Sequence, residues 1–353
     1  MALTQVRPEG LGFVNGKRNL IINGAMQVAQ RSTSLTVGDS TEYKTLDRYA
    51  IGINGTTAGR ATMSQSTDAP AGFGYSMKFD VTTADTSIGS GESFGVFQRI
   101  EGQNVQHINK GTSSAKKCVF SFYAKGTAKK YITEFRDDNG RQVSATFDVT
   151  TSWQRFEIEV PADTSGTIDN DNTAGFLAMF WIHAGSDYTS GTLNTSWGTS
   201  TNANRMVGCE SIFSSTDNEF YITGIQLEVG TNASDFEHES YGETLQKCER
   251  YFQRFVAGAN YTGFSVAFST SATSAKATLK FNGKMRAAPT ITQSNTGFNY
   301  GGQVAFSSFN TLYTGLDTSW IDMNIGSVGS AGQLGIWNGN NNGAAYVQMS
   351  AEL

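Results

Sequence analysis

Short segments in which apolar and polar residues alternate are the feature that most restricts how this chain can fold. Residues 155–160 (RFEIEV) place aromatic and aliphatic side chains on one side and charged side chains on the other, which is the two-residue period of a half-buried strand. Residues 76–81 (SMKFDV) alternate in the same way. Residues 118–124 (CVFSFYA) are apolar at both sets of positions, which predicts a strand covered on both faces.

Turn-forming residues separate these segments at intervals of about ten residues. Asn139-Gly140, between residues 130–136 and 141–149, is a strong hairpin signal because both residues tolerate a positive φ. Residues 175–182 (GFLAMFWI) and 219–229 (EFYITGIQLEV) have the composition of a buried strand and a further long strand. The region predicts a β-sandwich or jelly roll.

The composition excludes several other classes of protein. Charged residues make up 16% of the 353 residues and aromatic residues 12%, whereas disordered chains are rich in charge and poor in aromatics. The paucity of helix-favouring residues argues against an all-α fold. A net charge of −5 argues against nucleic acid as a partner. No apolar run approaches the ~20 residues of a membrane span, and no secretory signal is visible.

Residues 243–255 differ from the rest of the chain. Leu245, Cys248, Phe252 and Phe255 recur at three- and four-residue steps, and charged residues occupy the other side. This spacing predicts one amphipathic helix of about three turns.

The predicted helix divides the chain into parts. We assign residues 1–16 to an extended N-terminal docking segment and residues 17–240 to a jelly-roll β-sandwich domain. Residues 241–256 form the connecting helix, and residues 257–353 form a C-terminal β-sandwich tip domain. The N-terminal segment contains Pro8 and several glycines, so it is expected to order only when it docks on another protein. Arg7, Pro8 and Phe13 are its candidate docking residues.

The C-terminal region is nearly free of charge. From Ala287 to Leu353 there is no Lys, Arg or His, and the acidic residues are Asp317, Asp322 and Glu352. A solvated monomer surface normally carries more charge. We therefore expect this region either to be buried in an oligomer or to present a surface for uncharged polar ligands.

Seven segments carry a resemblance to a known family. They are residues 18–27 (RNLIINGAMQ), 45–49 (TLDRY), 97–101 (FQRIE), 120–125 (FSFYAK), 152–154 (SWQ), 220–230 (FYITGIQLEVG) and 236–252 (FEHESYGETLQKCERYF). Together they resemble the tail-fibre and receptor-binding proteins of tailed bacteriophages, especially T7-like phages of marine bacteria and the cyanophage type. The resemblance covers roughly two-thirds of the chain.

The resemblance implies a galactose-binding-like jelly roll, as in carbohydrate-binding modules, and a homotrimer at the end of a phage appendage. That class of domain often holds a structural calcium ion on acidic residues. The matching places in this chain read Met26-Gln27 and Thr223-Gly224, which contain no acid.

Metal and cofactor chemistry finds little support in the residue pattern. His, Cys and carboxylates do not cluster as zinc ligands would. Asp169-Asn170-Asp171-Asn172 is the best calcium candidate, through Asp169 and Asp171, but the same residues suit a hairpin turn. The three cysteines form no CxxC pair and are expected to be small buried hydrophobic residues. We expect no cofactor.

Catalytic patterns are equally sparse. The chain has three histidines, at positions 107, 183 and 238, and no GxSxG motif. Glu134, Asp137 and Asp138 are close enough in sequence to suggest a glycosidase pair, but they are expected to decorate a solvated hairpin. We therefore expect a protein that is not an enzyme.

Sugar binding needs exposed aromatic rings beside amide and hydroxyl groups. The C-terminal region is rich in both, and the candidate glycan-binding or receptor-binding residues are Tyr300, Tyr313, Trp337, Asn338, Asn340, Asn341 and Asn342. Trp320 belongs to the same aromatic set. The alternative is that the aromatic residues form a core or a trimer interface.

These observations predict a phage virion protein made in the bacterial cytoplasm. The predicted function is that of a homotrimeric tail-fibre or receptor-binding subunit, which joins other phage proteins through its N-terminal segment and binds a host surface glycan. The alternatives are a capsid fibre, head decoration or tail adaptor protein without receptor binding, and a glycan depolymerase.

Overall fold

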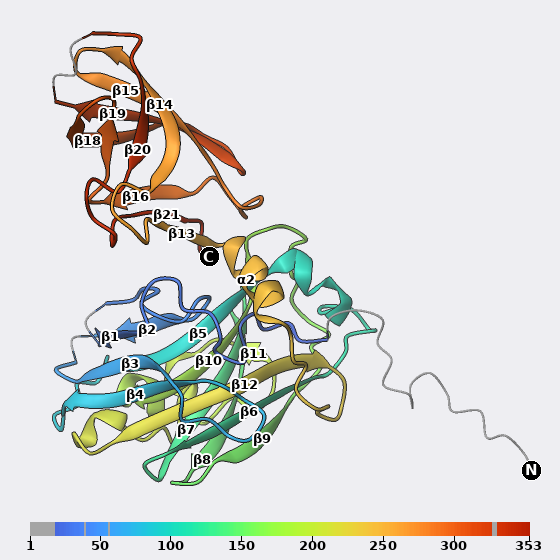
Figure 1. Ribbon diagram of the computed structural model, residues 1–353. Helices are drawn as coiled ribbons and strands as arrows, with labels where there is room; N and C mark the ends of the chain where they lie inside the picture. Colours follow the sequence, from blue (N-terminus) through green and yellow to red (C-terminus); the bar gives the residue numbers. More distant parts are fainter. Residues whose placement is uncertain (1–17, 39, 56, 327–329) are drawn as a thin grey trace, which may run out of the picture. The chain divides into compact units, whose positions relative to one another are not determined.

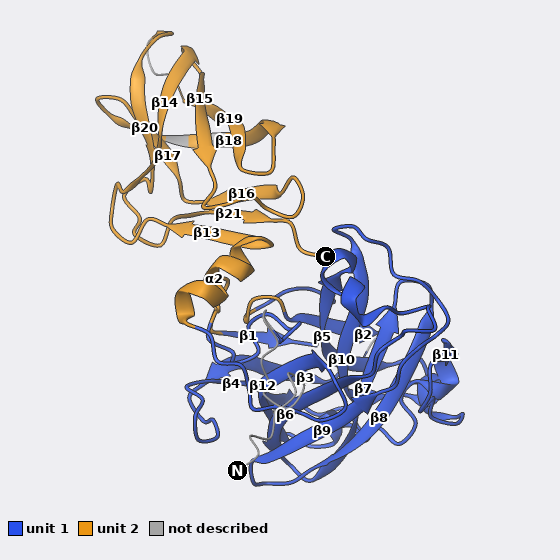
Figure 2. Cartoon of the chain, turned by 90° about the vertical axis from the view of Figure 1, so that its right-hand side faces the viewer, with its two compact units in different colours: residues 1–27, 34–44, 49–239 blue, residues 28–33, 45–48, 240–353 orange. Residues whose placement is uncertain are grey.

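The computed structural model describes residues 18–38, 40–55, 57–326 and 330–353. The N-terminal docking segment, with Arg7, Pro8 and Phe13, lies outside these residues. The chain forms two compact units (Figure 2). Of the described residues, those up to Gln27, 34–44 and 49–239 belong to the first unit, and 28–33, 45–48 and those from Ser240 onward belong to the second.

Two six-stranded antiparallel sheets build the first unit (Figure 1). The first sheet has the order β1 (Ser34–Val37), β3 (Arg60–Ser66), β4 (Ser76–Thr83), β12 (Glu219–Val229), β6 (Cys118–Gly126) and β9 (Gln154–Val160). The second has the order β11 (Gly198–Thr199), β8 (Arg141–Val149), β7 (Lys129–Asp137), β10 (Ala174–Ala184), β5 (Ser93–Glu101) and β2 (Ala50–Asn54).

Phenylalanine rings fill the space between the two sheets. Phe122 of β6 meets Phe180 of β10 edge to face, with ring centroids 4.9 Å apart, and Phe79 of β4 meets Phe94 of β5 at 5.8 Å. Such contacts between opposite sheets define a β-sandwich. The predicted all-β class and jelly-roll sandwich are confirmed.

The local strand predictions agree with the structure. β6 is buried on both faces over most of its length, and β7 and β8 form the predicted hairpin. Within that turn Gly140 takes a positive φ of 77°, whereas Asn139 does not, so the turn depends on the glycine.

A second apolar cluster covers the outer face of the second sheet. Ile132, Met179 and Trp181 point outward from their strands and pack with Tyr188 and Met206 from the segment of residues 185–214. This segment contains α1 (Ser186–Thr189), η4 (Asn202–Asn204) and η5 (Ile212–Ser214), while η2 (Gly102–Asn104) and η3 (Gln106–Ile108) follow β5. The sheet is therefore a buried middle layer here rather than an open binding face.

The second unit begins with α2 (Tyr241–Glu249), which is shorter than predicted. A capping box starts the helix, because the Ser240 side chain accepts from the Glu243 N–H while the Glu243 carboxylate accepts from the Ser240 N–H. The helix predicted for residues 241–256 is wrong beyond Glu249, since Phe252–Val256 forms strand β13. The backbone there pairs with β21 (Tyr346–Ser350), a partner distant in sequence that the local spacing does not reveal.

The rest of the second unit consists of a three-stranded sheet and a closed barrel. The sheet has the order β13, β21 and β16 (Thr290–Ser294). The barrel has the order β14 (Gly263–Ser271), β15 (Ser274–Lys280), β19 (Thr318–Ile325), β18 (Gln303–Thr314), β17 (Gly297–Asn299) and β20 (Leu334–Asn338). The tip is all-β as expected, but its strands close on themselves instead of forming two packed sheets.

Small residues line one side of the barrel interior. Ala267 of β14 and Ala275 and Ala277 of β15 are 5% exposed or less, and they share one core with the fully buried Trp337 of β20. A six-stranded barrel has a narrow interior, and on this side the indole leaves space for little more than methyl groups, whereas Phe298, Ile321 and Met323 fill the rest. Phe264 of β14 packs against Trp337, whereas Val266 and Phe268 of the same strand lie on the outside, as described below.

Two short segments from the N-terminal half complete the second unit. The Arg48 guanidinium is 1% exposed, pairs with the Glu352 carboxylate and lies 3.4 Å from the centroid of the Tyr251 ring. Asp47 is fully buried beside Arg31, and burial raises the pKa of its carboxyl to about 6. In the described residues we find no helix with the length and hydropathy needed to cross a bilayer.

Candidate functional site

Trp337 does not reach the surface. It is fully buried in the barrel, with its ring centroid 5.5 Å from that of Phe309 and 5.8 Å from that of Phe264. The prediction that Trp337 contacts a glycan is wrong, because the narrow barrel needs one large ring to fill it.

The Asn-rich loop is held by its own amides. Asn338 is 2% exposed and exchanges hydrogen bonds with Gln303 at 3.0 and 3.2 Å, so its predicted glycan contact is also wrong. Its Oδ1 also accepts from the Asn340 N–H, and the Asn342 Oδ1 accepts from the Ala344 N–H. Asn340 and Asn341 adopt left-handed φ values of 45° and 58°. These residues form a turn, and Asn341 is the one of its four asparagines that is largely exposed.

Tyr300 and Tyr313 have different environments. Tyr300 is half-buried and stacks on Phe298, with an interplanar angle of 8° and centroids 5.9 Å apart. Tyr313 is 74% exposed. It lies directly opposite Trp320 in the pairing of β18 with β19, and Trp320 is 50% exposed.

The rings of Tyr313 and Trp320 form an exposed corner. Their centroids are 6.2 Å apart and their planes meet at 67°. The two rings and the turn residues Thr314, Gly315 and Thr318 line an open hollow of about 550 Å³, which we call the aromatic corner.

The polar groups of the aromatic corner are hydroxyls. Thr318 Oγ1 donates to the Leu279 carbonyl at 3.1 Å, and Thr314 Oγ1 lies 3.0 Å from Ser319 Oγ. An oxygen that already donates still has lone pairs for a ligand hydroxyl. With no charged residue in its lining, the corner suits an uncharged polar ligand with an apolar face. Strand pairing across the turn brings the two rings together, and sequence reasoning missed the lining threonines.

The predicted calcium loop is an ordinary polar turn. The Asp171 carboxylate accepts from the N–H and the hydroxyl of Thr173, at 2.9 and 2.7 Å, and these hydrogen bonds lower its pKa. The Asp169 carbonyl accepts from the Gln106 side chain. The described part of the chain contains no group of three or more His, Cys, Asp or Glu side chains placed to hold a metal ion.

The positions where the resemblance would place calcium are occupied by other groups. The Gln65 amide donates to the carbonyls of Met26 and Gln27, at 2.7 and 3.1 Å. Thr223 donates its hydroxyl to the Tyr75 carbonyl, and Gly224 adopts a φ of 62°. Backbone carbonyls here are satisfied by a neutral amide, which needs no cation.

Two of the three acids near the β7–β8 hairpin are buried, contrary to the expectation that they are solvated. Glu134 is fully buried, forms a two-pronged ion pair with Arg205 and accepts from the Trp181 indole at 2.6 Å. Asp137 is 3% exposed and lies 2.7 Å from Lys110 Nζ. Neither carboxylate is accessible to a sugar, and both serve structure.

One hydrogen-bonded chain resembles a hydrolytic triad in its residue types. His183 Nδ1 lies 2.7 Å from Ser211 Oγ, and His183 Nε2 lies 3.4 Å from Glu92 Oε2. All three residues are less than 10% exposed, and burial lowers the pKa of His183. Ser211 Oγ also caps η5 by accepting from the Phe213 N–H. A nucleophile without access to substrate does not support catalysis.

The cysteine thiols are all free. Cys118 and Cys248 are buried as predicted, whereas Cys209 is partly exposed. Burial raises the pKa of Cys118 to about 12 and that of Cys248 well above its ordinary value. Such thiols are poor nucleophiles.

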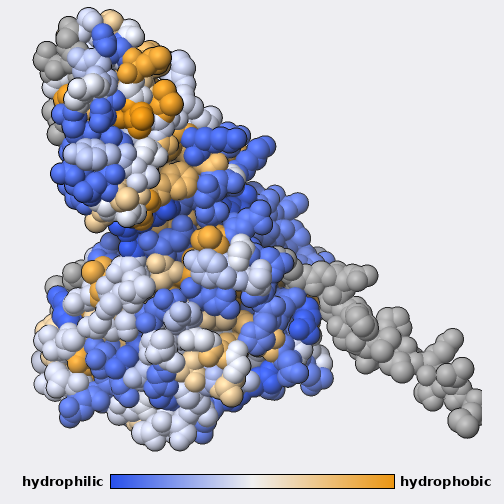
Figure 3. Space-filling model, in the orientation of Figure 1, coloured by the Kyte–Doolittle hydropathy of each residue, from blue (hydrophilic) through white to orange (hydrophobic). Residues whose placement is uncertain are grey.

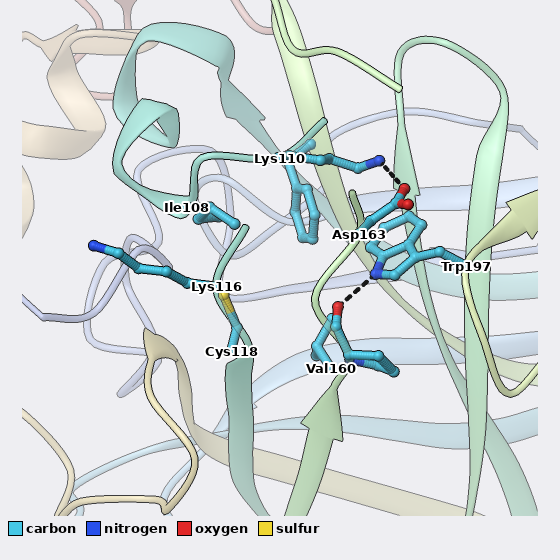
Figure 4. A pocket seen from close by; sticks show the side chains of 9 residues that line it. Ile108, Lys110, Lys116, Cys118, Val160, Asp163 and Trp197 are labelled. Carbon is cyan, nitrogen blue, oxygen red and sulfur yellow. Dashed lines mark hydrogen bonds and ion pairs between the residues drawn. The ribbon is translucent and has the colours of Figure 1, made fainter. Parts of the chain in front are cut away.

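A small cavity in the first unit is too small for a sugar (Figure 4). Lys110 crosses one side of it, pairs with Asp163 and lies 4.4 Å from the centroid of the Trp197 ring. The Trp197 indole donates to the Pro161 carbonyl at 2.7 Å. The volume of about 10 Å³ holds roughly one water molecule.

Comparison with known proteins shows likeness at the level of solved structures. No family model and no curated protein matches the chain. The enzymatically active domain of bacteriophage CBA120 tailspike protein 4 is similar at 13% identity and a TM-score of 0.32, over 60% of this chain and 21% of that one. The family 11 carbohydrate-binding module of Clostridium thermocellum Lic26A-Cel5E aligns at 15% identity and a TM-score of 0.29, over 56% of this chain and 98% of the module. TmCBM61, solved in complex with β-1,4-galactotriose, aligns at 10% identity and a TM-score of 0.30, over 61% of this chain and 100% of that one.

Proposed function

We propose that this chain is a phage virion structural protein, a tail-fibre or receptor-binding subunit that attaches the particle to a glycan on the host surface. The observation that carries the proposal is the aromatic corner, in which Tyr313 and Trp320 stay exposed at 74% and 50%. The proposal includes a homotrimer on the phage tail or particle surface, joined to other virion proteins through residues 1–16.

The binding chemistry follows from the shape of a pyranose ring. One face of many hexoses presents C–H groups, which pack on an aromatic ring, while the ring edge carries hydroxyls. In the aromatic corner Trp320 supplies the stacking surface, Tyr313 closes the second side, and the hydroxyls of Thr314 and Thr318 face the sugar edge. Because the lining is uncharged, an uncharged sugar is bound without leaving a buried charge unpaired.

Adhesion, rather than hydrolysis, is the role that this lining supports. Acid–base cleavage of a glycosidic bond needs two carboxylates across the scissile bond, and the five residues that line the aromatic corner include none. A shallow site of this kind binds a single sugar weakly. Three identical sites on one particle appendage raise the overall affinity through effective concentration.

The test is glycan binding by the full chain and by single variants. We expect host surface polysaccharide, or a neutral oligosaccharide from it, to bind the wild type in isothermal titration calorimetry. Trp320→Ala and Tyr313→Ala should each weaken the affinity per site by about tenfold or more, as expected for a central aromatic contact.

A matched control is Tyr261→Ala. Tyr261 is 47% exposed in the same unit and does not line the aromatic corner. Binding that survives loss of Trp320, or that falls equally in the control, would reject the site. Absence of glycan binding by the wild type would favour a capsid fibre, head decoration or tail adaptor role, and release of reducing ends from the polysaccharide would favour a depolymerase.

A further inference from the structure

Four apolar side chains form an exposed block on the outside of the barrel. Val266 and Phe268 of β14 are 69% and 46% exposed, and Leu334 and Ile336 of β20 are 75% and 49% exposed. They are directly paired across the two strands, Val266 with Ile336 and Phe268 with Leu334. Figure 3 shows hydrophobic residues gathered on the barrel surface where Figure 1 draws β14 and β20. We call this block the β14–β20 face.

The packing of the barrel explains why these side chains point outward. Ala267, between Val266 and Phe268, faces the interior, and its partner in register is Gly335. A Cβ on Gly335 would lie 2.4 Å from the Phe298 ring, so the interior has no room for larger residues there. The strand alternation then places the large apolar residues on the outer surface.

Such a face needs a partner. Large contiguous apolar patches on a protein surface mark interaction sites, whereas apolar residues scattered singly do not. The barrel is closed, so β14 and β20 both have hydrogen-bonded neighbours on either side and offer no free strand edge. Contact with a partner must therefore be made by side-chain packing.

The surroundings of the face favour a second copy of the same chain. Lys276 of β15 is paired with Phe268 of β14, and Asp322 of β19 is paired with Lys276. Lys276 and Asp322 are paired neighbours of opposite charge, so a second copy meets no block of like charge at this border. The chain as a whole carries a net charge of −5, so repulsion between copies is least where the surface is apolar and locally neutral.

We infer that the β14–β20 face is the surface through which copies of this chain associate. The inference rests on the homo-oligomer that forms part of the proposed function and adds the location of its interface. The four side chains supply the apolar centre, while Thr270, Thr278, Lys276 and Asp322 form the rim. A centre of this size is smaller than the ~800 Å² per partner of a standard interface, so the rim belongs to the contact.

The test is the oligomeric state of the full chain, measured by sedimentation velocity and light scattering over a concentration series. We expect the wild type to be oligomeric and Leu334→Glu and Phe268→Glu to dissociate. A buried, unpaired carboxylate should raise the dissociation constant by about 100-fold or more. Because both positions are exposed in the single chain, near-UV circular dichroism and the melting temperature should stay close to those of the wild type.

The matched control is Leu35→Glu. Leu35 is 43% exposed on β1, in the first unit, so this variant adds the same charge at an exposed leucine that is not part of the β14–β20 face. It should keep the wild-type mass. If Leu334→Glu and the double variant with Phe268→Glu both keep the wild-type mass, the location is wrong but the oligomer stands.

A monomeric wild type at every concentration would refute the oligomer and the interface together. Glycan binding is measured separately, by calorimetry with a monovalent oligosaccharide. A monomeric Leu334→Glu that still binds this sugar, but adheres poorly to cells, would support both the interface and the aromatic corner. Retained oligomers without sugar binding would refute only the glycan part of the proposed function.

Discussion

Replacing Trp337 by alanine should strongly destabilise the barrel, whereas replacing Trp320 should not. Trp337 is fully buried, and three phenylalanine rings surround its indole, those of Phe264, Phe309 and Phe306 at centroid distances of 5.8, 5.5 and 6.4 Å. Deleting a buried tryptophan side chain typically costs 3–5 kcal/mol, and the cost is highest where the surroundings cannot collapse. The inward-facing alanines of β14 and β15 are too short to fill the space.

One contribution acts in the opposite direction. The Trp337 Nε1–H is buried and has no hydrogen-bond partner in the described part of the chain, so its removal returns about 1 kcal/mol. The expected net cost of Trp337→Ala is therefore about 2–4 kcal/mol. Trp337→Phe removes the same N–H but keeps a ring, so its cost should be clearly smaller. Trp320→Ala, at a half-exposed position, should change stability by about 0.5–1 kcal/mol.

Hydrogen–deuterium exchange with mass spectrometry measures the loss of stability in each unit separately. Peptides from β14 to β20 report on the barrel, and peptides from β6 and β10 provide an internal reference. Urea unfolding gives the total. The reasoning would be refuted if Trp337→Ala exchanged like the wild type, or if Trp320→Ala cost as much as Trp337→Ala. The second result would mean that Trp320 is a packing residue and not a binding residue.

Three further predictions concern buried polar groups and a helix cap. Arg205→Met should cost the first unit about 3–5 kcal/mol in urea unfolding because it leaves Glu134 buried and unpaired, and adding Glu134→Met should recover most of the loss; a double variant as unstable as the single would contradict this. Asp47 has a folded pKa of about 6 against an ordinary 3.8, so the folded state favours its protonated form, and the free energy of unfolding should fall by up to about 3 kcal/mol as pH rises from 3.8 to 6. Asp47→Asn should flatten the dependence of the free energy of unfolding on pH in this range. An unchanged slope would mean that another group causes the dependence. Ser240→Ala should lower the stability of the second unit by about 1 kcal/mol, and exchange in α2 no faster than in the wild type would show that the cap contributes little.

Much of the first unit follows from the sequence because its strands carry local signals. The alternation of residues 155–160 gives β9, and the doubly apolar residues 118–124 give the central strand β6. The helix predicted for residues 241–256 is correct only as far as Glu249, because the same spacing of apolar residues continues into β13. Pairing with β21, about a hundred residues away, determines the backbone conformation of β13, and no local sequence pattern reveals this pairing.

The segments at residues 28–33 and 45–48 show a second limit. Arg48 and Asp47 read in sequence as ordinary polar residues of a loop, yet both are buried in the second unit. Their burial depends on Tyr251 and on Glu352, at the far end of the chain. A charged residue is exposed by default, and only its distant partner reverses that expectation.

The candidate site could be predicted in kind and in one of its rings, Tyr313, but not in which tryptophan lies beside it. Aromatic residues in a charge-poor region pointed to the barrel, but the sequence could not separate Trp337, which fills the interior, from Trp320, which lies outside. Both tryptophans lie on strands whose side chains alternate between the interior and the outer surface. Which of the two faces inward depends on how wide the barrel interior is.

The packing of the narrow barrel determines which side chains form the core and which form the aromatic corner and the β14–β20 face. Beside the buried indole, the interior-facing positions of β14 and β15 include Ala267, Ala275 and Ala277, and large apolar side chains at alternate positions of β14 lie on the outer surface. On β18 and β19 the outward residues include Tyr313 and Trp320, and on β14 and β20 they include Val266, Phe268, Leu334 and Ile336. Thr278 of β15 pairs with Trp320, so the corner and the face belong to neighbouring strands of one surface. A variant that widened the interior, such as Trp337→Ala, would therefore be expected to disturb sugar binding and self-association together, whereas Trp320→Ala and Leu334→Glu should separate them.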